Sequence, residues 1–199
     1  MQRAKTILAI LILSACLTPA FGQTVQIGEG SLMYIGLPLR PRVDYSYSQQ
    51  IYYASEIGGP GLITGISFQY DVHSSGYYQN NSQIRVWMAC SPLTELTSWM
   101  EPDSLSLVFQ GQLPQSAYSG GLPGTGWMHI ALDTPFDYNH QSNLVIAIKD
   151  DSPGRGHMQD DFFCTSHPLS RGITCSATED FAIGDFPTNT TYVRQAHAN

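Results

Sequence analysis

Charged side chains are scarce in this sequence, and basic ones are the scarcest. Only 13% of the 199 residues are charged, and nine Lys and Arg against 16 Asp and Glu give a net charge of −7. This acidic balance argues against a nucleic-acid-binding protein, which needs a basic surface to meet the phosphates. Low charge together with 18 glycines and 12 prolines excludes a coiled coil, a helical bundle and an acidic disordered tail.

Long hydrophobic runs are absent except at the N-terminus. There the basic Arg3 and Lys5 precede an apolar run over residues 6–13, which is too short to span about 30 Å of hydrocarbon as a helix. We therefore predict a signal peptide over residues 1–22, with cleavage after Gly22. The remaining residues, 23–199, are long enough for one domain, and no later segment is long and apolar enough to cross a membrane.

A second interpretation of the leader stays open. Residues 13–16, Leu-Ser-Ala-Cys, also match a bacterial lipoprotein box in which Cys16 would be lipidated. We favour cleavage after Gly22, because Leu17 and Phe21 make a poor polar tether and residues 24–27 already alternate like a strand. In both cases the protein is expected to be exported, either secreted or held at the cell surface.

Cysteine is rare as well, and the predicted mature chain keeps three: Cys90, Cys164 and Cys175. Cys164 and Cys175 lie in neighbouring strand-like segments, so we predict a disulfide between them in an oxidising compartment. Cys90 follows a period-two apolar pattern and is interpreted as a small buried hydrophobic residue.

Period-two alternation of apolar residues dominates what remains. One expected face holds Leu62, Phe68 and Tyr70, and further alternating segments cover residues 84–90 and 105–109. Around ten short strands at nearly regular spacing predict an all-β fold, a two-sheet antiparallel β-sandwich of jelly-roll-like topology. Strand order cannot be predicted from the pattern.

Three segments carry more specific expectations. Residues 127–132 and 144–148 are apolar at successive positions and are predicted to be central strands covered on both faces. Residues 92–100 are the only helix candidate. The C-terminal residues 191–199 begin like a strand and then stop, so either they form a tail or the chain is truncated at its C-terminus.

Catalytic signatures are missing. The sequence has no Gly-x-Ser-x-Gly elbow, no His-Glu-x-x-His pair and no Cys-x-x-Cys pair, and its six histidines show no metal-ligand spacing. We therefore expect a non-enzymatic protein.

One acidic group could bind Ca²⁺. Asp150 and Asp151 end an apolar strand, and Asp160 and Asp161 open the next one, so a hairpin would bring four carboxylates to one rim. Oxygen-rich clusters of this kind suit calcium. The alternatives are exposed carboxylates satisfied by basic side chains and water, or an acid and base pair of a hydrolase.

The other group is aromatic, because eight of the 11 tyrosines lie between Tyr34 and Tyr78. Adjacent side chains of a strand point to opposite faces, so one ring of the pair at residues 52–53 is expected to be exposed. Tyr77 and Tyr78 lie in a polar loop. We predict Tyr52, Tyr77 and Tyr78 as ligand-contacting residues and interpret Tyr45, Tyr47 and Tyr70 as packing residues.

Several segments together resemble a known kind of module. They are residues 45–57, 63–70, 84–88, 127–138 and 143–148. The resemblance is to a β-sandwich module of large secreted and surface proteins of Bacteroidota-like bacteria, similar to cleaved-adhesin domains. It implies the fold and an extracytoplasmic location, and it implies no catalytic site because the shared residues look like core and turn positions.

Three functions follow as hypotheses. We favour an exported, non-enzymatic binding or adhesion module of the bacterial cell surface, which recognises a glycan or a surface protein through loops at one end of the sandwich. The second hypothesis is a structural spacer domain of a larger surface protein. The third is a polysaccharide or peptide hydrolase domain that uses two of the four aspartates named above.

Overall fold

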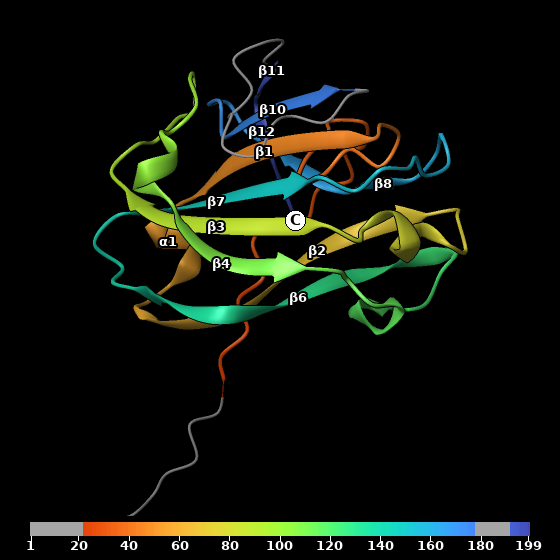
Figure 1. Cartoon of the computed structure of the whole chain (residues 1–199). Helices are drawn as coiled ribbons and strands as arrows, with labels where there is room; N and C mark the ends of the chain where they lie inside the picture. Colours follow the sequence, from red (N-terminus) through yellow and green to blue (C-terminus); the bar gives the residue numbers. More distant parts are fainter. Residues whose placement is uncertain (1–21, 178–191) are drawn as a thin grey trace, which may run out of the picture.

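The computed structural model describes residues 22–177 and 192–199. Within these residues the chain forms two antiparallel sheets packed face to face, which confirms the predicted all-β sandwich (Figure 1). The larger sheet has the strand order β11-β10-β1-β7-β3-β4 and the smaller one β5-β6-β2-β8, while β12 and β9 form a separate pair. The strands are β1 (Tyr45–Tyr52), β2 (Gly61–Val72), β3 (Ile84–Ser91), β4 (Ser106–Gly111), β5 (Tyr118–Ser119), β6 (Gly124–Tyr138), β7 (Asn143–Asp150), β8 (Asp161–Phe162), β9 (Cys164–Ser166), β10 (Gly172–Ala177), β11 (Tyr192–Arg194) and β12 (Ala196–Ala198).

Helical structure is limited to short turns in the described residues. They are α1 (Ala54–Ile57) and the 3-10 turns η1 (Tyr77–Asn80), η2 (Pro102–Ser104) and η3 (Gln115–Ala117). None of them is long and apolar enough to cross a membrane. The predicted leader, residues 1–22, lies outside the described residues except for Gly22.

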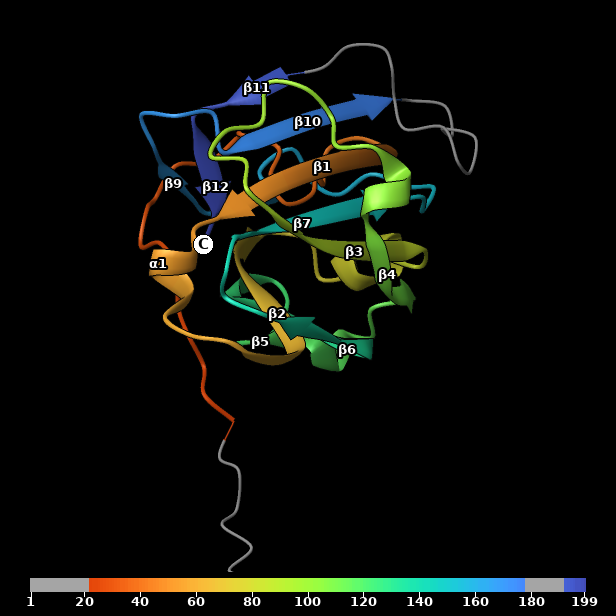
Figure 2. The ribbon, with the colours of Figure 1, turned by 90° about the vertical axis from the view of Figure 1, so that its left-hand side faces the viewer.

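Apolar side chains from the two sheets meet in the main core, between the layers seen end-on in Figure 2. Phe68 on β2 and Met128 on β6 are buried in it together with Val86 on β3 and Ile146 on β7. Burying a side chain of this size stabilises the fold by about 1.5–3 kcal/mol. The expectation that alternating apolar residues point inward is therefore confirmed at these strands.

The outer face of the six-stranded sheet carries a second apolar cluster. Leu96 and Leu105, from the segment between β3 and β4, pack with Val145 and Ala147 of β7. Both faces of β7 are thus covered, as predicted for residues 144–148. The same prediction is wrong for residues 127–132, where β6 alternates buried and more exposed positions because only one face of its sheet meets the core.

The segment between β3 and β4 is not the predicted helix. Its backbone bonds to other parts of the fold instead: the Leu96 amide donates to the Ser170 carbonyl (2.6 Å) and the Met100 amide donates to Oε1 of Gln49 (2.8 Å). Tertiary contacts therefore replace the hydrogen bonds that a helix would have made.

Two register shifts change which side chains face the core. The pairing of β2 with β6 shifts between Ile63 and Gly65, so that Ile63 packs against the main core while Leu62 is 62% exposed. A second shift, between β3 and β4, leaves Leu107 exposed and places Val108 in the core. A bulge reverses the alternation, so the inward positions predicted for Leu62 and Leu107 are wrong.

One edge of the six-stranded sheet is β4. A side chain from the opposite sheet binds one of its backbone amides: the Gln110 amide donates to Oδ2 of Asp133 on β6 (2.9 Å). The edge strand is therefore both bulged and bound by a carboxylate.

The last described residues are part of the sandwich. Strand β12 pairs with β9, and Ala196, His197, Ala198 and Asn199 are all buried. The side-chain amide of Asn199 donates to the Gly30 carbonyl (2.6 Å). The expectation of a tail is wrong for residues 196–199, because they pack and pair like any other strand.

Candidate functional site

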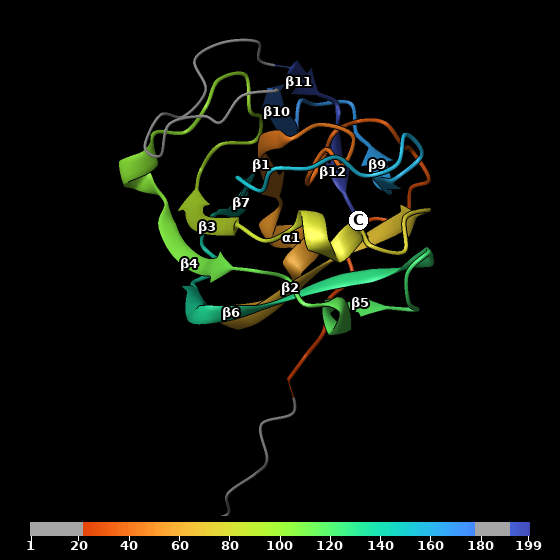
Figure 3. The same cartoon turned by 45° about the vertical axis from the view of Figure 1, so that its right-hand side comes forward.

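Two of the three tyrosines predicted to contact a ligand are buried. Tyr52 lies on the inner face of β1 and donates to the Ala198 carbonyl (3.1 Å), while Tyr77 packs edge-on against Tyr118. Figure 3 shows the turn η1, which carries Tyr77, closing the space between the two sheets. The prediction is wrong for Tyr52 and Tyr77, and Tyr78 alone keeps a half-buried position. Tyr47 and Tyr70 are buried, as the packing interpretation expected.

The four aspartates do not converge on a calcium site. Asp160 accepts hydrogen bonds from the backbone amides of His73 and His157 (both 2.7 Å), and Asp161 accepts one from the Tyr34 amide (2.7 Å). In the part of the chain that the structure describes, no three His, Cys, Asp or Glu side chains are placed to hold a metal ion. The calcium prediction for Asp150, Asp151, Asp160 and Asp161 is therefore wrong, because each carboxylate is engaged by a different part of the fold.

The first two aspartates also cannot act as a pair. Asp150 lies two residues after Ile148, whose side chain faces the main core, so Asp150 faces inward as well. Asp151 instead bonds to Arg85 and Lys149, which face outward. Successive side chains of an extended chain point to opposite faces, so Asp150 and Asp151 lie on different sides of the sheet. This arrangement gives no support to a hydrolase that would use both.

The predicted disulfide is absent. Cys164 and Cys175 are both free thiols, and they belong to different apolar clusters. Cys164 on β9 faces the main core, where its thiol donates weakly to the Leu37 carbonyl (3.5 Å). Cys175 on β10 is part of the outer cluster, and burial raises its pKa to about 12. Two strands that are adjacent in sequence thus enter different sheets, which spacing along the chain could not reveal.

The carboxyl group of Asp150 has a raised pKa, and a testable prediction follows from it. Burial raises its pKa to about 7, against hydrogen bonds from Ser152 that lower it. Because the folded state holds this proton more tightly than the unfolded state, stability falls as the pH rises from about 4 to about 7. We expect Asp150→Asn to raise the free energy of unfolding by about 2 kcal/mol near pH 8, since it removes a buried charge and keeps an acceptor for the Ser152 amide.

Urea unfolding of both proteins across this pH range measures the effect. The partly exposed Asp44, whose pKa is lowered by its hydrogen bond with Arg155, provides the control Asp44→Asn. This variant should leave the dependence of the free energy of unfolding on pH unchanged between about pH 5 and pH 8. If the free energy of unfolding depended on pH equally in the parent and in Asp150→Asn, the raised pKa could not belong to Asp150.

The most distinctive polar group lies on the outer face of the six-stranded sheet. The strand register places Tyr47 of β1 and Arg85 of β3 on either side of Lys149 of β7. Asp151 joins them: Lys149 Nζ lies 2.7 Å from its Oδ1, and Arg85 Nε donates to its Oδ2 (2.8 Å). We call Arg85, Lys149 and Asp151 the charged triad.

Three aromatic rings adjoin the charged triad. Tyr47 packs against Trp99 with ring centroids 4.9 Å apart and meets Trp87 edge-on at 6.4 Å. The guanidinium of Arg85 lies 5.5 Å from the centre of the Trp87 ring. Tyr47 is buried, whereas Trp87 and Trp99 are half-buried and so keep part of each indole at the surface. We call Tyr47, Trp87 and Trp99 the aromatic cluster.

Gln49 holds the aromatic cluster in place. Its amide nitrogen donates to the Tyr47 hydroxyl (2.8 Å) and to the Met100 carbonyl (3.1 Å), and its Oε1 accepts from the Met100 amide. Trp99 is therefore positioned by its neighbour in the chain, which is tied to β1 by two hydrogen bonds. Such fixed rings lose little conformational freedom when a ligand binds.

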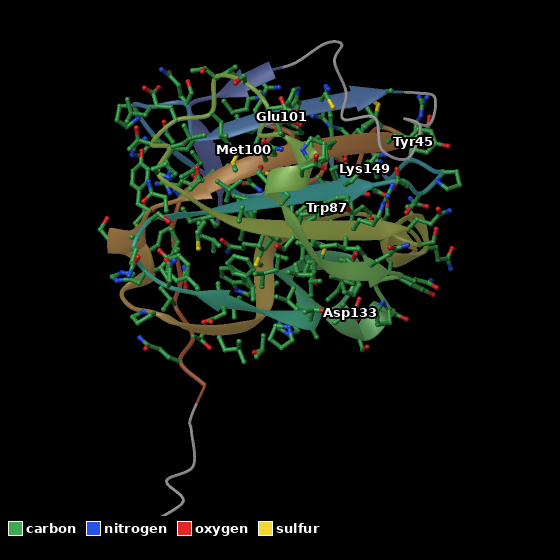
Figure 4. All side chains as sticks on the ribbon, turned by 60° about the vertical axis from the view of Figure 1, so that its left-hand side comes forward. Tyr45, Trp87, Met100, Glu101, Asp133 and Lys149 are labelled. Atoms are coloured by element: carbon green, nitrogen blue, oxygen red, sulfur yellow. The ribbon has the colours of Figure 1, made fainter. Side chains whose placement is uncertain are left out.

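Figure 4 looks onto this face of the molecule. Trp87 and Lys149 lie near its middle, Met100 and Glu101 lie along one border, and Tyr45 and Asp133 lie farther out. The sequence pattern did not predict this site, because its rings lie over the face of a sheet and only Tyr52, Tyr77 and Tyr78 were expected to contact a ligand. The sequence does contain a signal for it. Arg85 and Trp87 are two residues apart, as are Tyr45 and Tyr47, so the two side chains of each pair lie on the same face of their strand.

Comparison of the chain with family models, with curated proteins and with solved structures gave no match in any of the three.

Proposed function

We propose that the chain is an exported, non-enzymatic β-sandwich module that binds a glycan on the outer face of its six-stranded sheet. The observation that carries the proposal is the aromatic cluster beside the charged triad on one rigid face. It replaces the end loops as the binding surface, because Tyr52 and Tyr77 are buried.

The chemistry of this face suits a sugar. The flat face of a pyranose ring exposes C–H groups that pack on an indole, and its hydroxyls both donate and accept hydrogen bonds. Trp87 and Trp99 supply the rings, and Arg85 of the charged triad supplies N–H donors beside them. The sheet and Gln49 hold the aromatic cluster in place, so its rings need little rearrangement when a ligand binds.

The cellular setting is part of the proposal. The leader at residues 1–22 and the resemblance to surface modules of Bacteroidota-like bacteria, similar to cleaved-adhesin domains, support export and a role at the cell surface. A structural spacer would need no half-exposed tryptophans beside a charged group, so the outer face favours binding over that alternative. The experiment below distinguishes a glycan ligand from a surface protein as the ligand.

Glycan arrays followed by titration calorimetry test the proposal. We expect the purified protein to bind a subset of glycans and Trp87→Ala to weaken that binding at least about tenfold, or about 1.4 kcal/mol, because a stacking surface is lost. The matched control is Trp127→Ala, which removes a half-buried tryptophan from the outer face of the other sheet and should leave affinity unchanged.

Two outcomes would contradict the proposal. One is the absence of glycan binding while the protein is retained by a purified surface protein, which would make the module a protein-binding one. The other is equal loss of affinity in Trp87→Ala and Trp127→Ala, which would move the binding site away from the outer face.

A further inference from the structure

Strand β12 is a short strand at one side of the sandwich, next to β9 (Figure 2). It pairs over three residues, and two side chains of β1 add to its attachment. Oε1 of Gln50 accepts a hydrogen bond from the Ala198 amide (2.7 Å), and the Tyr52 hydroxyl donates to the Ala198 carbonyl (3.1 Å). A strand with so few bonds opens at a lower free energy than the long strands at the centres of the two sheets.

The segment at residues 28–32 is attached at the same place. The side-chain amide of Asn199 donates to the Gly30 carbonyl (2.6 Å), and the Gly30 amide donates to the hydroxyl of Thr165 on β9 (2.8 Å). Loosening β12 therefore loosens this segment as well. We call residues 28–32 and 196–199 the clasp.

A buried histidine lies within the clasp. His197 is 2% exposed, its ring meets Tyr52 edge-on at 5.4 Å, and a Cβ atom at Gly28 would lie 3.0 Å from its Cε1. Its Nδ1 donates to the Ala198 carbonyl (3.0 Å), so a further proton must go to Nε2. Nε2 makes no hydrogen bond with any residue that the structure describes. A positive charge on this ring would therefore be buried without an acceptor, which is costly.

The charged groups around His197 make a second positive charge less favourable still. The fully buried Arg171 approaches the same Tyr52 ring, with its central carbon 6.0 Å from the ring centre. Burial and then the charge of Arg171 lower the pKa of His197, and His167 acts in the same direction. The bond to the backbone carbonyl and the carboxylate of Glu56 act in the opposite direction, but Glu56 is already paired with Arg171. The closed clasp therefore favours the neutral imidazole.

We propose that the clasp is an acid-sensitive latch: on mild acidification His197 takes up a proton beside Arg171, and β12 and residues 28–32 loosen from β9 while both main sheets stay folded. The open state exposes the charged imidazole to water, whereas the closed state holds it next to a buried guanidinium. The proposal is independent of glycan binding, because Tyr52 and the aromatic cluster lie on opposite faces of β1.

The direction of the effect follows from the lowered pKa of His197. The open state binds the proton more readily than the closed state, so the closed clasp loses stability as the pH falls below about 6.5, the ordinary value for histidine. Asp150 and Asp161 act in the opposite direction, because burial raises the pKa of each and acid then favours the folded form. Glu56 stays ionised in this range, since its pKa lies below its ordinary value.

Hydrogen exchange followed by mass spectrometry tests the proposal on the purified protein. Exchange is measured at about pH 7.5 and about pH 5, on either side of the ordinary pKa of histidine, and the rates are corrected for the intrinsic effect of pH. We expect peptides that cover the clasp to exchange at least about fivefold faster at the lower pH. Peptides from β3 and β7 should keep their protection.

Two variants at position 197 remove the titrating group. His197→Phe keeps a ring beside Tyr52, and His197→Gln keeps a side-chain donor, so each preserves part of the local structure. In both, the acceleration at the lower pH should fall below about twofold. The control is His129→Gln, which removes an exposed histidine of β6 and should keep the full acceleration. Circular dichroism verifies folding, and one folded variant at position 197 is enough for the comparison.

Three results would overturn the proposal. The first is unchanged exchange of the clasp in the parent protein. The second is an acceleration of equal size in the parent and in the His197 variants, which would place the titrating group elsewhere. The third is faster exchange throughout β3 and β7 together with the clasp, because acid would then unfold the whole sandwich and not the latch.

Discussion

Replacing Arg171 with methionine is expected to lower the free energy of unfolding by about 3–5 kcal/mol, a large part of the stability of a domain of this size. Arg171 follows the segment that joins β9 to β10, and its side chain is completely buried. Its Nη1 donates to Oε1 of Glu56 (2.7 Å), and its Nε and Nη2 both donate to the Ile51 carbonyl (2.9 and 2.7 Å).

The loss is large because one guanidinium serves several groups at once. It also stacks on the Tyr53 ring, with its central carbon 4.1 Å from the ring centre. Without it, the Ile51 carbonyl loses both guanidinium donors, and the half-buried Glu56 loses its ion-pair partner. Only the backbone bond from the Ile51 amide to the Arg171 carbonyl (2.9 Å) stays in place. Breaking a buried ion pair by removing one member costs more than the pair contributes, because the other charge stays behind.

Urea denaturation of Arg171→Met measures this loss. Arg171→Lys should be destabilised as well, since an ammonium cannot reproduce the planar fork. The control is Arg155→Met, where an exposed pair is removed and the expected change in the free energy of unfolding is small. Equal stability of the Arg171 and Arg155 variants would show that the buried pair does not hold β1, α1 and β10 together.

Asp160→Ala is expected to destabilise the opposite end of the sandwich by about 3–5 kcal/mol, because it leaves several donors without an acceptor. The carboxylate is fully buried and accepts hydrogen bonds from the His73 amide (2.7 Å), the Ser74 amide (3.2 Å), the Ser74 hydroxyl (2.6 Å) and the His157 amide (2.7 Å). It thereby joins the end of β2 to the loop before β8.

Chemical denaturation again measures the change, with Asp160→Asn as a second variant. The amide keeps one acceptor oxygen but turns an N–H₂ group toward donors, so an intermediate loss is expected. Asp103, exposed in η2, provides the control Asp103→Ala, which should cost less than about 0.5 kcal/mol. If Asp160→Ala matched that control, the carboxylate would not be a structural acceptor.

Sequence alone was sufficient for the fold class and for most strands, because alternation depends only on local burial. It placed Phe68, Val86 and Ile146 in the core correctly. It failed at Leu62 and Leu107, where bulges reverse the inward face, since a bulge is a property of the strand pair and not of either strand.

The candidate site was harder to predict for a related reason. Tyr47 and Tyr52 lie on the same strand, yet they point to opposite faces and take part in different clusters. The neighbours that give Trp87 and Trp99 a shared surface come from separate segments, brought together by the register of β1, β7 and β3 and by Gln49. Composition suggested aromatic contacts, but only the pairing of strands could indicate which rings meet.

The hydrogen bond between Asp133 and the Gln110 amide affects how copies of this protein meet. A neighbouring molecule that tried to extend the six-stranded sheet at β4 would have to displace a charged oxygen from a main-chain donor. The bulge in the pairing of β3 with β4 also distorts this edge strand, so it lacks the regular, straight backbone on which a fibril could grow. A β-rich protein with such a blocked border can reach a high local concentration without extending its six-stranded sheet at β4 into a neighbouring molecule.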